Sequence, residues 1–100
     1  MTQEKDLQLL LAKLQELFPY LAERYKVESL GIFGSYVRQQ QKPGSDLDLL
    51  VTFSEPPGLI KFIELENYLS DSLDVKVDLV MKRALKPRIG ERILKEVVPV

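Results

Sequence analysis

The hydrophobic residues of this chain recur with two different periods, one typical of helices and one typical of strands. From residue 3 to 18, leucines recur every three or four positions, which predicts an amphipathic helix that Pro19 breaks or bends. Residues 20–25 are expected to add a further turn or two. Strands are then predicted for two apolar segments, residues 27–33 and 47–53. Each segment ends at a polar or glycine-containing stretch.

The second half of the chain continues this alternation. Residues 59–72 and 86–97 have apolar positions at helical spacing, and residues 75–81 are predicted to form a third strand. Residues 35–40 predict a short helix with Ser35 as its N-cap. This order of elements predicts a small α/β domain, a mixed sheet packed by helices, in which the second and third strands form a parallel βαβ unit.

Two aspartates, Asp46 and Asp48, open the second predicted strand. Alternate side chains of a strand point to opposite faces, so both carboxylates share one face while Leu47 and Leu49 share the other. Like charges at such positions repel each other and are costly to desolvate, which favours a positive group between them. Asp78, in the middle of the third strand, joins them if the two strands are neighbours, and three convergent carboxylates favour a Mg²⁺ site.

Gly34 and Ser35, directly after the first predicted strand, form a candidate phosphate-binding turn. Glycine allows close approach of the backbone, amides at a helix start favour anions, and Ser35 adds a hydroxyl donor. Arg38 is placed one turn later, where it can neutralise a phosphate or a leaving pyrophosphate. Such a turn followed by a carboxylate pair is what a metal-dependent nucleotide enzyme needs, with Asp78 also available to accept a hydroxyl proton.

Each of these residues has a simpler interpretation as a turn, a cap, a solvated side chain or a surface ion pair. The residues concerned are Gly34, Ser35, Arg38, Asp46, Asp48 and Asp78. Asp78 in particular has Lys76 and Lys82 as potential ion-pair partners. Asp74 is a rival third carboxylate, although its place before the strand is typical of a helix-to-strand turn. The joint pattern of all these residues favours the nucleotide site.

Composition limits the chemistry of such a site. The chain has no cysteine and no histidine, so thiol nucleophiles, zinc–thiolate sites and a histidine base are excluded, and a metal must be held by oxygen ligands. The formal net charge of −1 provides no basic field for long nucleic acids, so direct nucleic-acid binding is not expected. No segment resembles a membrane span or a signal peptide, which predicts a cytoplasmic protein without a membrane partner.

The pattern Gly34-Ser35, ten residues, then Asp46-x-Asp48 resembles the signature of the DNA polymerase β-like nucleotidyltransferase superfamily. The segments around it are similar to the minimal nucleotidyltransferase (MNT) branch, and the resemblance spans about residues 30–98. Those segments are residues 34–38, 45–51, 77–80, 86–88 and 91–98. Val37, Gln39 and Pro99 depart from the branch, because they stand where an alanine, a glycine and an aromatic residue are frequent.

The resemblance implies the polymerase β-like nucleotidyltransferase fold, as a single domain over residues 1–100. The N-terminal helix is expected at about residues 3–18 and the catalytic core at about 27–98. Metal binding is assigned to Asp46 and Asp48, metal binding or hydroxyl activation to Asp78, and triphosphate binding to Gly34 and Ser35.

Members of the MNT branch are commonly antitoxins encoded beside a HEPN-domain ribonuclease toxin. The implied function is Mg²⁺-dependent transfer of AMP from ATP to a hydroxyl of that toxin, typically on a tyrosine, within a hetero-oligomer.

Two other functions stay open from the sequence. The first is an antitoxin that blocks its toxin by contact alone, without chemistry. The second is a nucleotidyltransferase whose acceptor is an RNA end or a small molecule such as an antibiotic. The near-neutral charge argues against RNA, and the short chain argues against a self-contained antibiotic pocket.

Overall fold

The computed structural model describes residues 6–42 and 44–100. Its elements are, in chain order, α1 (Leu7–Tyr25), β1 (Val27–Phe33), the 3₁₀ turn η1 (Gly34–Tyr36), β2 (Leu47–Phe53), α2 (Leu59–Leu73), β3 (Val77–Met81), the 3₁₀ turn η2 (Lys82–Ala84), α3 (Pro87–Glu96) and β4 (Val98–Pro99). The predicted mixed α/β architecture is confirmed, and the first two strands have the predicted bounds. Within these ranges, no helix combines the length and the apolar character needed to cross a membrane.

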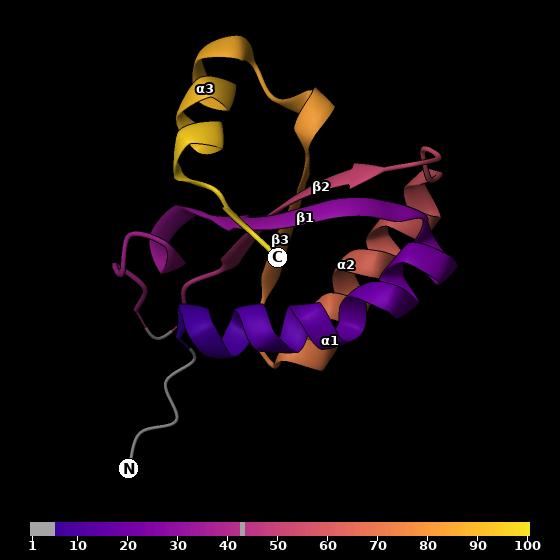
Figure 1. The fold of residues 1–100 in the computed structure, drawn as a ribbon, viewed down its shortest axis with the longest axis horizontal. Coiled ribbons are helices and arrows are strands. Elements are labelled where there is room, and N and C mark those ends of the chain that lie inside the picture. Colours follow the sequence, from indigo (N-terminus) through magenta and orange to yellow (C-terminus); the bar gives the residue numbers. More distant parts are fainter. Residues whose placement is uncertain (1–5, 43) are drawn as a thin grey trace.

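The four strands form one mixed sheet in the order β3-β2-β1-β4. Strand β1 is antiparallel to both β2 and β4, whereas β2 and β3 are parallel and are joined by α2. The predicted parallel pairing of the second and third strands is therefore confirmed. Helices α1 and α2 lie together on one face of the sheet, and α3 stands apart from them beyond the other face (Figure 1).

The core lies between the sheet and the pair α1 and α2. Leu47 and Leu49 of β2 are fully buried there together with Leu65 and Leu69 of α2. Full burial of such a side chain contributes roughly 1.5–3 kcal/mol, so these positions fix which face of β2 points inward. Because strand side chains alternate, Asp48 points to the opposite face, toward α3.

A break or bend was predicted at Pro19, and the break is wrong, because helix α1 continues through this residue. The further turns expected over residues 20–25 are confirmed. The helix begins with Asp6 as its N-cap, whose side chain accepts a hydrogen bond from the Leu9 amide at 2.9 Å. Its start therefore lies later than the predicted residue 3, and residues 1–5 are outside the described ranges. Leu21 and Tyr25, beyond the proline, are buried in the same core as the earlier leucines. Their burial outweighs the cost of about 3 kcal/mol that a proline inside a helix carries.

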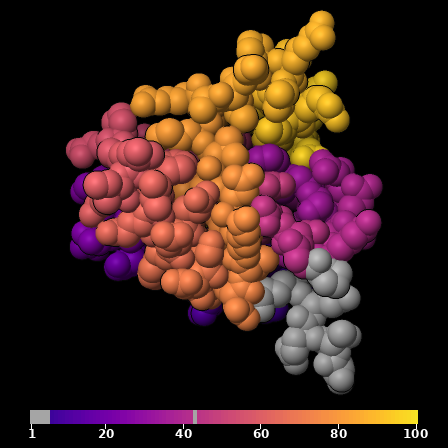
Figure 2. Space-filling model, turned by 180° about the vertical axis from the view of Figure 1, so that it is seen from behind, coloured from indigo at the N-terminus to yellow at the C-terminus, as the bar shows by residue number. Residues whose placement is uncertain are grey.

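Strand β3 forms one edge of the sheet, and side chains of α2 cover that edge. The amide of Val77 donates to Ser70 Oγ at 3.0 Å, and the amide of Leu79 donates to Glu66 Oε2 at 2.8 Å. In the space-filling view, α2 lies directly against this strand (Figure 2). The strand begins at Val77, two residues later than predicted, and its unpaired backbone donors are satisfied within the chain.

The opposite edge is β4, a two-residue strand that the sequence analysis missed. Val98 pairs with Ile32 and Pro99 pairs with Gly31 of β1. Pro99 has no amide hydrogen, which is tolerated at a sheet edge. A Cβ at Gly31 would collide with Cγ2 of Val97, so this glycine lets the C-terminal segment lie close against β1. The end of α3 is thereby held beside the end of β1.

Candidate active site

Gly34 forms the turn at the end of β1, with a φ of +83°. The amide of Val37 donates to the Gly34 carbonyl at 3.1 Å, which closes a tight 3₁₀ turn. A helix over residues 35–40 was predicted, but regular structure ends at Tyr36, and Gln39 has a φ of +57° that does not suit a helix. The N-cap of the turn is Phe33, so the predicted capping role of Ser35 is wrong.

Asp48 faces this turn from the neighbouring strand. It lies opposite Phe33 in the antiparallel register and opposite Asp78 in the parallel register. A Cβ at Gly34 would occupy the place of Oδ2 of Asp48. Glycine is therefore required at position 34 for two reasons, namely its positive φ and the carboxylate packed against it.

Two of the predicted carboxylates, Asp46 and Asp78, act electrostatically on the third, Asp48. The pKa of Asp48 is raised from 3.8 to about 6, first by its burial and then by the negative charges of Asp78 and Asp46. Arg38 acts in the opposite direction, and Glu96 adds to the increase. The pairing of strands β2 and β3 therefore brings Asp46, Asp48 and Asp78 together as one set of carboxylates, the aspartate group.

The simpler interpretation as a surface ion pair is not supported for Asp46, Asp48 and Asp78, whereas the interpretation as a turn residue holds for Asp74. In the described part of the chain the ion pairs are Arg24–Glu64 and Arg38–Glu96, and neither includes a residue of the aspartate group. Asp74 ends α2 in a left-handed conformation, with φ of +53°, as expected for a residue of a helix-to-strand turn.

A cleft of about 240 Å³ lies between the sheet and α3. Its lining residues are Phe33, Gly34, Arg38, Asp48, Ile89, Arg92, Ile93 and Glu96. Three predicted site residues thus line one cleft, while Ser35, Asp46 and Asp78 lie outside its lining. A site that encloses a complete drug-sized ligand usually measures roughly 300–1,000 Å³, so this cleft has room for only part of a nucleotide.

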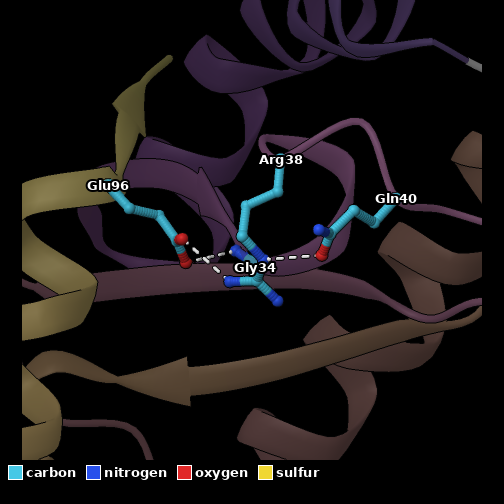
Figure 3. Close-up of polar contacts among 4 residues, drawn as sticks. All are labelled: Gly34, Arg38, Gln40 and Glu96. Atoms are coloured by element: carbon cyan, nitrogen blue, oxygen red, sulfur yellow. Dashed lines mark hydrogen bonds and ion pairs between the residues drawn. The ribbon is translucent and has the colours of Figure 1, made fainter.

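Glu96, the last residue of α3, binds the turn and was not predicted from the sequence. Its Oε2 accepts a hydrogen bond from the Gly34 amide at 2.8 Å, and its Oε1 accepts one from Nη1 of Arg38 at 2.8 Å (Figure 3). Although burial acts to raise the pKa of Glu96, the bonds from Gly34 and Arg38 and the charge of Arg92 lower it overall. The carboxylate is therefore ionised at neutral pH. The sequence contains no local signal for this contact, because 62 positions separate Glu96 from Gly34.

The carboxylate oxygens of the aspartate group are the kind of ligand that a hard divalent cation such as Mg²⁺ prefers. Burial and the neighbouring aspartates raise the pKa of Asp48, so its ionised form is disfavoured in the folded protein. A bound cation would stabilise that ionised form. Within residues 6–42 and 44–100, however, no three acidic side chains form a ready-made metal site. Mg²⁺ commonly takes one or two carboxylates together with substrate phosphates, so an incomplete protein ligand set agrees with that mode.

Comparison with known proteins gives a consistent picture. Residues 14–100 match the model of the nucleotidyltransferase domain. The protein adenylyltransferase MntA of Thermococcus cleftensis is 55% identical over 78 residues, covering 78% of this chain and 79% of that protein.

Solved structures agree with this assignment. The structure of a minimal nucleotidyltransferase has a TM-score of 0.81 at 35% identity, covering 99% of this chain and all of the other. A toxin–antitoxin with AMP-PNP has a TM-score of 0.71 at 26% identity, covering 85% of this chain and 69% of that one. A tri-AMPylated Shewanella oneidensis HEPN toxin in complex with MNT antitoxin shares the fold, with a TM-score of 0.66 at 22% identity over 90% of this chain and 70% of that one. The turn, the aspartate group and these likenesses together establish that the chain belongs to the nucleotidyltransferase domain family, among the minimal nucleotidyltransferases.

Proposed function

We propose that this nucleotidyltransferase transfers AMP from ATP, with Mg²⁺, to a hydroxyl group of a HEPN-domain toxin and acts in the cytoplasm as the antitoxin of that toxin. The observation that carries the proposal is the position of Asp48. It lies in the cleft beside Gly34 and Arg38, and it has Asp46 directly before the same strand and Asp78 on the adjacent strand β3. A nucleotide whose phosphates reach this cleft meets acidic metal ligands on one side and arginines on the other.

We propose a role for each candidate residue of the catalytic core, which spans about residues 27–98. Asp46 and Asp48 would hold Mg²⁺, with Asp78 as a further ligand or as the proton acceptor. Ser35 would donate a hydrogen bond from its hydroxyl to the triphosphate. Arg38 would neutralise the phosphate chain from within the cleft. When bound, Mg²⁺ supplies positive charge that stabilises the negative charge developing on the phosphates.

The transfer itself is a displacement at the α-phosphorus of ATP. The acceptor oxygen forms a new O–P bond while the bond from that phosphorus to the bridging oxygen of the β-phosphate breaks, so pyrophosphate leaves. In the role of proton acceptor, Asp78 would take the hydroxyl proton on its carboxylate, which is exposed on β3 and accessible to an acceptor from outside. Positioning and charge stabilisation, rather than covalent catalysis, provide the rate acceleration.

The acceptor is proposed to be a second protein because the cleft is small and open. With about 240 Å³ between the sheet and α3, the described residues offer no room there for both a complete nucleotide and an acceptor. The toxin–antitoxin with AMP-PNP provides a related protein in which an ATP analogue and a toxin partner occur together. A HEPN toxin with a reactive tyrosine is the partner that the family resemblance implies.

The test is label transfer with ATP labelled at the α-phosphate, in the presence and absence of the toxin encoded beside this gene. Wild-type protein is expected to place stable label on the toxin and to abolish its ribonuclease activity. Asp46→Asn and Asp48→Asn are expected to place none while still folding. Asp71→Asn is the matched control, because it removes one carboxylate from an exposed position on α2.

The outcomes separate the alternatives. If the toxin is inhibited but no label transfers, the chain acts as an antitoxin by contact alone. If label appears on RNA or on a small molecule instead of the toxin, the acceptor assignment is wrong. Undiminished transfer by both aspartate variants would overturn the metal assignment.

A further inference from the structure

The strongest contact at the cleft that the proposed mechanism does not use is the one between Glu96 and the glycine turn. One carboxylate bonds two groups from separate parts of the turn, the Gly34 amide and the Arg38 guanidinium, each at 2.8 Å. On its other side, Arg38 donates from Nε to Oε1 of Gln40 at 3.1 Å. We propose that Glu96 is a positioning residue, which holds Arg38 so that its remaining N–H groups point to the phosphates of the nucleotide.

The geometry of Arg38 supports positioning. Arginine has five N–H donors in a fixed plane, and the two acceptors engage Nε and one terminal nitrogen. Figure 3 shows the second terminal nitrogen directed away from both Glu96 and Gln40. Arg38 is half exposed, so without these bonds its long side chain would sample many rotamers. With Arg38 held from two sides, three of its five donors remain free, and two of these lie on the second terminal nitrogen, where a ligand can accept from them.

The fold places Glu96 firmly enough to serve this role. It is the last residue of α3, and the next residues form β4 against β1. The Val100 amide donates to the Leu30 carbonyl at 3.0 Å, which extends the pairing to the end of the described chain. In the space-filling view, the yellow C-terminal segment lies against the purple segment that contains the turn (Figure 2).

The proposal rests on the proposed function in one respect, namely that the cleft takes the phosphates of ATP. Equilibrium binding of Mg-ATP and the KM for ATP in label transfer are therefore measured together for wild type, Glu96→Gln, Arg38→Gln and the double variant. Glutamine keeps one acceptor for the Gly34 amide but is not able to accept from both donors as the carboxylate does. Glu91→Gln is the control, since Glu91 is exposed on the same helix and loses the same charge.

Glu96→Gln is expected to weaken ATP binding and raise the KM by roughly three- to tenfold, the effect of leaving one long side chain unfixed. Glu91→Gln should bind ATP as wild type does. The decisive result is non-additivity: the double variant should bind ATP no more weakly than Arg38→Gln alone, because Glu96 acts through Arg38.

Three results would overturn the proposal. Additive losses would mean that Glu96 acts independently of Arg38. Unchanged binding by Glu96→Gln would mean that no positioning is needed, and tighter binding would identify Glu96 as a competitor of phosphate.

The wild-type result and one additional variant separate the remaining cases. A wild-type protein that binds no ATP overturns the proposed function as well, whereas wild-type binding with unchanged variants overturns the positioning role only. If Glu96→Gln does not fold, exposed Gln40→Ala tests the other side of Arg38, and ATP affinity equal to wild type would then refute the positioning of this arginine.

Discussion

Replacing Asp48 with asparagine is expected to stabilise the protein at neutral pH while abolishing transfer. The pKa of this carboxyl is raised from 3.8 to about 6 by burial and by Asp78 and Asp46, so its ionised form is unfavourable in the folded state. The difference corresponds to about 3 kcal/mol at 1.36 kcal/mol per pH unit. Asp48 is only half-buried, and solvent screening reduces this to about 1–2 kcal/mol.

The pH dependence has a definite sign. Because the folded-state pKa exceeds the unfolded value, the folded protein binds more protons between about pH 4 and pH 6. The contribution of Asp48 to stability therefore falls as the pH rises through this window, and its full penalty is present above pH 6. Asparagine carries no charge at any pH, so the variant should lack this part of the pH dependence.

Urea unfolding of wild type and Asp48→Asn at pH 4 and pH 7.5, without divalent cations, measures the effect. The variant should gain about 1–2 kcal/mol at pH 7.5, equivalent to roughly 5–10 °C in Tm, and much less at pH 4. Asp71→Asn, at an exposed position of α2, controls for loss of one charge. Equal differences at the two pH values, or a less stable variant at pH 7.5, would refute the electrostatic account of Asp48.

Two glycine substitutions test the close contacts around the site. Gly34→Ala should lower stability by at least about 1–2 kcal/mol through its positive φ and should also displace Asp48 and abolish transfer. Gly44→Ala is the control, because Gly44 also has a positive φ but a Cβ there meets open space. Both variants are measured by urea unfolding and label transfer, and equal effects of Gly34→Ala and Gly44→Ala would exclude the contact with Asp48. Gly31→Ala should cost about 1–3 kcal/mol by its collision with Val97, measured by thermal unfolding. Adding Val97→Ala should restore part of that loss, and failure to do so would argue against the close packing of the C-terminal segment on β1.

Much of the fold could be predicted because its elements are defined by local periodicity. The first two strands have the predicted bounds, since their apolar residues form a buried face that only one register satisfies. The parallel pairing of β2 and β3 follows from the helix between them. That pairing sets Asp48 opposite Asp78, so the predicted grouping of the carboxylates depended only on topology and alternation.

The errors arise where tertiary contacts override local rules. A break or bend was expected at Pro19, but α1 continues through it, because the apolar positions stay in phase from Leu14 to Leu21 and their burial keeps the chain helical. That phase is visible in the sequence and is the signal that should have outweighed the proline. Strand β4 has no such signal, because a two-residue strand containing Pro99 exists only through its pairing with β1.

The contact of Glu96 with the turn shows why this site is a property of the whole chain and not of its signature alone. The signature supplies Gly34, whose missing side chain leaves room for Asp48, but the amide and the arginine of the turn are bonded by a residue 62 positions away. That residue is held by β4, which packs on β1 only because Gly31 admits Val97. A substitution at Gly31 should therefore weaken both stability and ATP binding, although it touches no catalytic group. The ionised form of Asp48 is destabilising where it stands, and the C-terminal segment keeps the opposing wall of the cleft in place.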